Sequence, residues 1–143
     1  MRKNLEVADL GDLVELPLAA VLATYRSDGT VLLSPVWHEY RDGGFTVVVY
    51  EDDIKARHLR RDPRAVLVVA EALPPFRGVE VSGTVHLRSD GVRDAIERIA
   101  VRYLGAQRGR AYAEATGGGV IVRLEPGRLR AWDFQDDMAA FDG

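Results

Sequence analysis

One stretch of this sequence decides the fold: VEVSGTVHL, residues 79–87. Valine or leucine at positions 79, 81, 85 and 87 alternates with polar side chains at positions 80, 82, 84 and 86. This period of two is that of a strand with one buried face and one polar face. Gly83 interrupts the apolar face, and a glycine inside a strand often marks a bulge or a close approach of another backbone. The stretch therefore predicts a half-buried strand of an antiparallel sheet.

Strand patterns dominate the rest of the chain as well. Short runs rich in β-branched and aromatic residues predict further strands at residues 20–25, 31–40, 45–50, 65–70, 120–124 and 129–134. Most of the connections are short turns, and Asp28-Gly29 is typical of a hairpin. Six or seven antiparallel strands joined in this way favour a barrel or sandwich over a doubly wound parallel sheet.

Helices are expected at three places between the strands. The first begins near Asp52 or Asp53, either of which can cap it, and it ends before Pro63. The second covers residues 92–104, where apolar side chains recur at helical spacing. A shorter helix is expected over residues 110–115. The glycines at 117–119 are interpreted as a flexible connection, and the tail from 136 to 143 as loosely held.

Length and composition limit the function classes. The 143 residues suit one domain, spanning 1–143. The chain has no cysteine, which excludes disulfides, iron–sulfur clusters and a cysteine nucleophile. A net charge of −3 with scattered basic residues argues against nucleic-acid binding. No apolar run suits a membrane span or a signal peptide, so a cytoplasmic protein is expected. The three histidines show no metal-binding spacing on a helix, so no metal is expected.

The segment after residue 50 is a candidate phosphate site. Lys55 and Arg57 lie in the first turns of a predicted helix, where unpaired N–H groups and a lysine together suit a phosphate. The structural alternative is a solvated basic helix balanced by nearby acidic residues. Neither the dinucleotide-binding glycine motif nor the P-loop motif occurs in the chain.

Two aromatic segments are further candidates. Pro35 removes a ladder donor from its strand, so residues 34–37 form either an edge that meets a planar ring or a bulge with Trp37 in the core. Trp132 and Phe134 share one strand face. They either line a cofactor pocket or a dimer interface, or they pack in the core.

Together these segments resemble the pyridoxamine 5′-phosphate oxidase-like proteins. The opening of that family is similar to residues 23–24, 28–30 and 34–37 (Ala-Thr, Asp-Gly-Thr and Ser-Pro-Val-Trp). KARHLRRDPR at 55–64 resembles the family's Lys-x-Arg-Asn-Leu-x-x-Asp-Pro-Arg signature, and Gly83-Thr84 matches the strand that follows it. LRRDPR at 59–64 is typical of the flavin/deazaflavin oxidoreductases that use coenzyme F420. The resemblance extends from about Val21 to Phe134.

The resemblance implies a fold, a cofactor and a set of contacts. The fold would be mainly β with inserted helices, a six- to seven-stranded antiparallel split β-barrel of the FMN-binding type, forming a homodimer with cofactor sites at the interface. The cofactor would be F420, or alternatively FMN, and the activity hydride transfer between this cofactor and a small organic substrate. No catalytic side chain is assigned, because the cofactor carries the chemistry. Lys55 would bind the cofactor phosphate with help from Arg57. The other implied contacts are Ser34, Pro35, Val36, Trp37, Tyr50 and His58, together with Phe76, Arg77, Gly78 and Trp132, which would approach the cofactor from the partner chain.

Two residues depart from the family pattern, and alternative functions stay open. Tyr50 stands where the family often has a small hydroxyl residue, and His58 replaces a common asparagine. One alternative is an FMN-dependent oxidase or reductase on the same barrel. Another is a non-enzymatic flavin or haem carrier, with His38 or His86 as axial ligand. The longer acidic tail of F420 would favour extra basic groups such as Arg60, Arg61 or Arg77.

Overall fold

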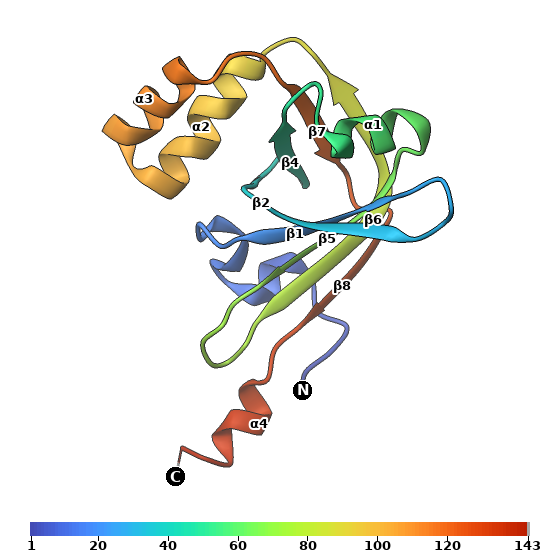
Figure 1. Cartoon of the computed structure of the whole chain (residues 1–143). Coiled ribbons are helices and arrows are strands. Elements are labelled where there is room, and N and C mark those ends of the chain that lie inside the picture. The colour runs from blue at the N-terminus through green and yellow to red at the C-terminus, as the bar shows by residue number, and fades with distance from the viewer. Residues whose placement is uncertain (143) are drawn as a thin grey trace.

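The alternating stretch forms the middle of the longest strand, β6 (Gly78–Arg88), in an eight-stranded antiparallel sheet. The computed structural model describes residues 1–142. The sheet curls into an open barrel with strand order β2-β1-β5-β6-β7-β4-β3, and β8 pairs with β6 (Figure 1). The other strands are β1 (Ala20–Tyr25), β2 (Val31–Val36), β3 (Glu39–Arg41), β4 (Gly44–Val49), β5 (Arg64–Ala70), β7 (Val120–Leu124) and β8 (Arg128–Trp132). The predicted fold class, a mainly antiparallel split barrel with inserted helices, is confirmed.

Gly83 is the point at which β6 changes partners. Its first part pairs with β8, through Val79 and Ala131 among others, and its last part pairs with β7 from Val85 onward. The turn that joins β7 to β8 crosses β6 between these parts. A Cβ atom at residue 83 would lie 2.9 Å from the Glu125 carbonyl oxygen, closer than real contacts allow. The predicted close approach of another backbone is therefore confirmed.

The barrel core is filled by the inward side chains of the strands and closed by two short 3-10 helices. These helices, η1 (Val7–Leu10) and η2 (Leu13–Glu15), lie beneath the barrel and were not predicted (Figure 1). Leu10 and Leu13 are fully buried there. On the strands, Phe45 is the largest fully buried side chain. These residues form one cluster with the apolar face of β6.

The predicted strand over residues 31–40 is divided into two, which raises the strand count to eight. The break falls at Trp37 and His38. The His38 backbone N–H donates to the Tyr103 hydroxyl at 3.0 Å, and the His38 carbonyl accepts from Arg102. The backbone here is therefore bonded to side chains of a helix and not to a neighbouring strand. The sequence between residues 31 and 40 shows no sign of these distant partners.

In the described part of the chain, four α-helices accompany the sheet. They are α1 (Ile54–Arg61), α2 (Val92–Leu104), α3 (Ala106–Ala115) and α4 (Gln135–Ala139). The predicted helices before Pro63 and over 92–104 are confirmed, whereas the third begins four residues earlier than predicted. The predicted loose tail contains α4, none of whose side chains is buried. Within residues 1–142, no helix combines the length and the apolar character needed to cross a membrane.

Helices α2 and α3 form an antiparallel hairpin that stands apart from the barrel (Figure 1). Their buried side chains, among them Ile96, Ile99 and Ala113, do not belong to the core cluster of the barrel. Polar contacts are among those that attach α2 to the barrel. Arg102 donates to the carbonyls of Val14 and Leu16 at 3.2 and 3.1 Å. Residues of the hairpin and residues of the barrel both line a space between the two.

Candidate functional site

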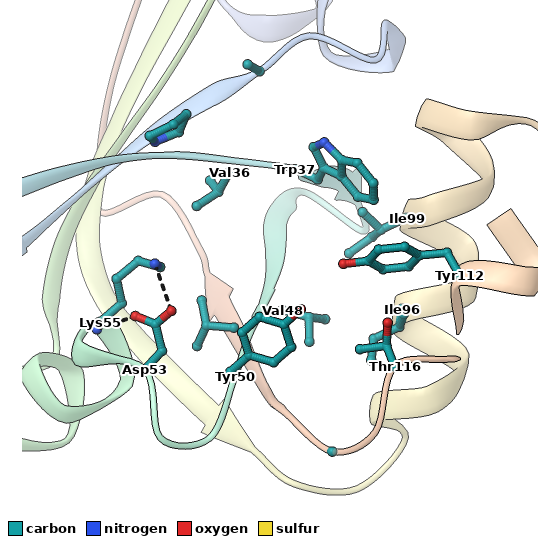
Figure 2. A pocket seen from close by; sticks show the side chains of 14 residues that line it. Val36, Trp37, Val48, Tyr50, Asp53, Lys55, Ile96, Ile99, Tyr112 and Thr116 are labelled. Atoms are coloured by element: carbon teal, nitrogen blue, oxygen red, sulfur yellow. Dashed lines mark hydrogen bonds and ion pairs between the residues drawn. The ribbon is translucent and has the colours of Figure 1, made fainter. Parts of the chain in front are cut away.

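That space is a pocket with a volume of about 430 Å³ between the barrel and the helical hairpin (Figure 2). Its walls come from the ends of β2 and β4, the start of α1, and the inner sides of α2 and α3. The lining residues are Ala19, Pro35, Val36, Trp37, Val48, Val49, Tyr50, Asp53, Lys55, Ile96, Ile99, Tyr112, Thr116 and Gly118. Pockets of this size and mostly apolar lining typically hold small organic ligands.

An ion pair marks one end of the pocket. Asp53 caps α1, and its Oδ1 accepts a hydrogen bond from the Lys55 backbone N–H at 2.8 Å. Its Oδ2 lies 3.0 Å from Nζ of Lys55. Burial acts to raise the pKa of Asp53, but the hydrogen bonds from Lys55 outweigh it and hold that pKa below its usual value. Both charged groups therefore stand inside the pocket and face each other (Figure 2).

Aromatic rings form the other end. The ring of Trp37 stacks on that of Tyr103 with centroids 4.9 Å apart and planes 10° apart. Tyr112 lies on α3 with its ring centroid 5.2 Å from that of Trp37. Tyr50 also lines the pocket, between the ion pair and Thr116 (Figure 2). Burial, and next the neighbouring Tyr50 side chain, raise the pKa of Tyr112, so its hydroxyl stays protonated at neutral pH.

A buried histidine, His38, contacts the tyrosine on which Trp37 stacks. The Tyr103 hydroxyl donates to the Leu18 carbonyl at 2.7 Å and lies 3.0 Å from Nδ1 of His38. Because that hydroxyl has a single proton, Nδ1 of His38 must carry the proton it donates to Tyr103. Nε2 of His38 is buried and has no hydrogen-bond partner among the described residues. Burial, and next the positive charge of Arg102, lower the pKa of His38 to about 4.

The structure brings five of the sequence-predicted contacts together in the pocket: Pro35, Val36, Trp37, Tyr50 and Lys55. Three others lie close by in the chain but outside the lining. Ser34 is buried within β2, and Arg57 is exposed on α1. His58 is buried beneath α1, where its Nδ1 lies 3.0 Å from the Thr24 hydroxyl. Trp37 lines the pocket and stacks on Tyr103, and it does not belong to the core cluster of the barrel.

The remaining four predicted contacts lie together near the start of β6 and do not line this pocket. They are Phe76, Arg77, Gly78 and Trp132. Trp132 packs directly over Gly78, where a Cβ atom would lie 2.2 Å from the indole ring. Phe76 and Phe134 are edge to face with centroids 6.4 Å apart. Within one chain, these residues therefore form a separate cluster.

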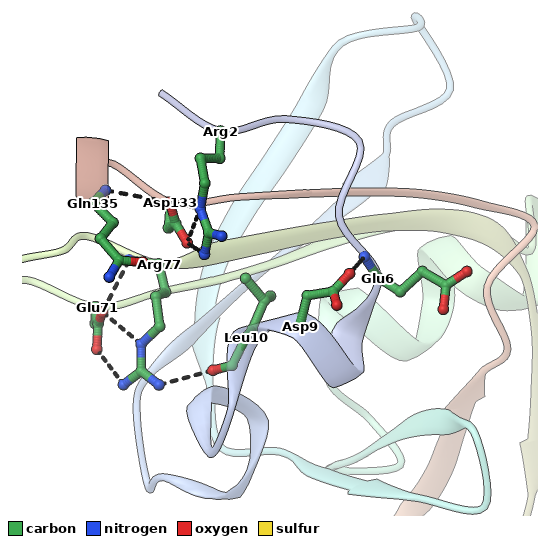
Figure 3. Close-up of polar contacts among 8 residues, drawn as sticks. All are labelled: Arg2, Glu6, Asp9, Leu10, Glu71, Arg77, Asp133 and Gln135. Atoms are coloured by element: carbon green, nitrogen blue, oxygen red, sulfur yellow. Dashed lines mark hydrogen bonds and ion pairs between the residues drawn. The ribbon is translucent and has the colours of Figure 1, made fainter. Parts of the chain in front are cut away.

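The side chain of Arg77 makes polar contacts outside that cluster (Figure 3). Its guanidinium donates to both Glu71 carboxylate oxygens, to the Leu10 carbonyl and to Asp12, each at 2.8 Å. Its hydrogen bonds to Glu71 and next to Asp12 raise the pKa of Arg77. Arg77 thus joins the N-terminal segment to the β5–β6 connection.

Sequence reasoning missed the helical side of the pocket. Ile96 and Ile99 follow a helical spacing that equally fits an ordinary core face, and nothing near Tyr112 marks it as a lining residue. Asp53 was considered as a helix cap and as one of the acidic residues that balance the basic helix, but not as a pocket residue. For metals, residues 1–142 contain no cluster of three or more His, Cys, Asp or Glu side chains that could hold an ion.

Comparison with known proteins defines the class. The model of the pyridoxamine 5′-phosphate oxidase family matches residues 8–133, and the chain belongs to this family. A search of the curated proteins finds no significant match.

Solved structures with the same fold differ in what their names describe. The conserved hypothetical protein Rv2991 from Mycobacterium tuberculosis is 26% identical, with a TM-score of 0.76, over 91% of this chain and 86% of that one. An F420 reductase is 24% identical, with a TM-score of 0.68, over 82% and 93%. The haem storage protein HutZ from Vibrio cholerae is 14% identical, with a TM-score of 0.67, over 86% and 92%. The fold is therefore shared with proteins whose names describe F420 reduction and haem storage.

Proposed function

We propose that this protein is an F420-dependent oxidoreductase that transfers a hydride between the bound deazaflavin and a small organic substrate. The observation that carries the proposal is the pocket, which has a lysine at one end and flat apolar and aromatic walls at the other. When bound, the deazaflavin ring supplies the hydride. The names of similar structures, an F420 reductase among them, support a cofactor of this kind.

The lining residues fit a phosphate-bearing ring cofactor. Lys55 retains two ammonium donors beyond the one directed at Asp53, and these can bind a phosphate oxygen. Val36, Val48 and the other aliphatic side chains present apolar surface suited to a planar ring. The same residues fit FMN, so the choice between the two cofactors rests on the groups around Lys55.

The aromatic end suits the substrate. Trp37 and Tyr112 offer ring faces, and the protonated Tyr112 hydroxyl can donate a hydrogen bond to a polar group that gains negative charge. A stacked Tyr103 holds Trp37 in place, which keeps this wall rigid. These residues orient a substrate and exclude water from it.

Replacement of Lys55 tests the proposal. In parallel fluorescence titrations, the wild-type protein is expected to bind F420 in the micromolar range or tighter. Lys55→Ala is expected to weaken that binding about 10- to 50-fold, because a charge-assisted hydrogen bond to phosphate is lost. Lys3→Ala is the matched control, since Lys3 is exposed and remote from the pocket lining. Failure of the wild-type protein to bind either F420 or FMN would refute the proposal.

We also propose that two copies of the chain form a homodimer through the β2 edge. Leu33 on β2 is 62% exposed and Val31 is 41% exposed, so the outer face of this edge strand is apolar. Unpaired apolar edge strands are prone to pair with another chain. The outer face of β2 leads to Pro35 at the pocket, which would place both pockets near the interface.

The dimer has a direct test in solution. Leu33→Asp is expected to weaken the dimer by at least about tenfold, because in a two-fold interface each substitution counts twice. Sedimentation velocity over a concentration series measures this change. Leu73→Asp is the control, because Leu73 is 73% exposed but lies in the β5–β6 connection. A wild-type protein that sediments as a monomer would contradict the dimer proposal.

A haem carrier finds less support in the side chains. His38, the first candidate axial ligand, is fully buried behind Tyr103 and so is not positioned to reach a bound haem. His86 is exposed on β6, away from the pocket lining.

A further inference from the structure

Asp53 is an acidic side chain placed where a phosphate is proposed to bind. Its carboxylate and the Lys55 ammonium are both about four-fifths buried, with exposed fractions of 20% and 18%. Both line the pocket. The described lining residues include no other charged side chain, so the pair leaves this end of the pocket with no net charge.

Capping of α1 accounts for only half of this arrangement. Oδ1 of Asp53 accepts the Lys55 backbone N–H, which is the usual role of an N-cap side chain. Asparagine and serine fill that role equally well and carry no charge. Oδ2 is the atom that brings the charge to Nζ of Lys55. The negative charge is therefore a feature of the pocket beyond what the helix requires.

An anion that binds Lys55 must come close to this carboxylate. Oδ2 is 3.0 Å from Nζ, so an oxygen bound to the same ammonium shares its immediate surroundings. Coulomb repulsion grows in proportion to the charge on the incoming group. A phosphate monoester carries about −1.5 to −2 charges at pH 7, because its second pKa is near 6. A phosphodiester has no second acidic proton and carries a single charge.

We propose that Asp53 makes this pocket select a phosphodiester over a phosphate monoester. The inference rests on the proposed function, because F420 carries its side chain through a phosphodiester whereas FMN ends in a monoester. Lys55 attracts both groups, whereas Asp53 repels the monoester about twice as strongly as it repels the diester. Asp53 is thus a specificity-determining residue that separates two cofactors with similar ring systems.

The test compares cofactor selectivity in two proteins. Wild-type protein and Asp53→Asn are titrated with F420 and FMN by fluorescence, and with riboflavin, which has no phosphate. Asp53→Asn keeps the helix cap and removes the charge. We expect it to raise affinity for FMN about tenfold more than affinity for F420. Riboflavin affinity is expected to stay unchanged.

Two further variants separate the charge from other effects. Asp52→Asn removes a neighbouring exposed carboxylate that does not line the pocket, and it is expected to leave the FMN-to-F420 ratio unchanged. Asp53→Ser replaces the cap with a different neutral side chain and is expected to match Asp53→Asn, so a folding defect in one variant does not decide the outcome.

The possible results are distinct. If wild-type protein binds F420 and the ratio does not change in the neutral variants, the inference is overturned while the proposed function stands. A wild-type preference for FMN also overturns it. If wild-type protein binds neither cofactor, the proposed function falls, and the inference with it.

Discussion

Between pH 7 and pH 4, wild-type protein is expected to lose about 3 kcal/mol more of its free energy of unfolding than a His38→Gln variant. The folded state lowers the pKa of His38 from 6.5 to about 4. Below pH 6.5 the unfolded chain therefore takes up a proton that the folded chain does not. Stability is lost as the pH falls towards 4 and is unaffected by this group above pH 6.5. Glutamine has no such titration.

Urea unfolding at several pH values measures this difference. His58 is also buried, which lowers its pKa, so the variant retains part of the acid dependence. His86→Gln is the control, because His86 is exposed on β6, and it should follow the wild-type curve. If His38→Gln and wild-type protein lose stability in parallel, burial and Arg102 do not keep His38 neutral in the folded state.

Gly109→Ala is expected to destabilise the protein by about 2 to 3 kcal/mol and to weaken ligand binding in the same variant. A Cβ atom at residue 109 would lie 2.6 Å from both N and Cα of Val101 on α2. Because these are backbone atoms, only a separation of α2 from α3 relieves the overlap. That separation would move Tyr112, which shares α3 with Gly109, away from Trp37.

Thermal denaturation and the F420 titration together measure both effects. Gly117→Ala is the matched control, since a Cβ atom at residue 117 meets no atom within 4 Å. It should unfold at the wild-type temperature and bind like wild type. A Gly109→Ala variant with unchanged stability would mean that the two helices are not packed backbone to backbone.

The strands were predictable because the sequence pattern that determines each strand lies within the strand itself. The alternation over residues 79–87 directly records which side chains of β6 face the core, and Gly83 records the crossing of the β7–β8 turn. The start of α1 was predictable in the same way. Asp53 is a strong cap, so the position of Lys55 at the helix start followed from the sequence.

The division of residues 31–40 and the helical wall of the pocket were not predictable. His38 leaves the strand because Tyr103 and Arg102, more than sixty residues later, take its backbone groups. Tyr112 becomes a pocket residue only because Gly109 lets α3 lie close against α2. Arg77 shows the opposite failure, because this basic residue, expected to contact a cofactor, forms ion pairs with Glu71 and Asp12.

The separate packing of the hairpin and the barrel has a consequence for how such a pocket can diversify. Ile96 and Ile99 on α2 and Tyr112 on α3 do not belong to the core cluster of the barrel. Substitutions there can reshape one end of the pocket at little cost to the barrel that positions Lys55. During evolution, substitutions in α2 and α3 could then change the substrate while the end of the pocket that holds Lys55 stays the same.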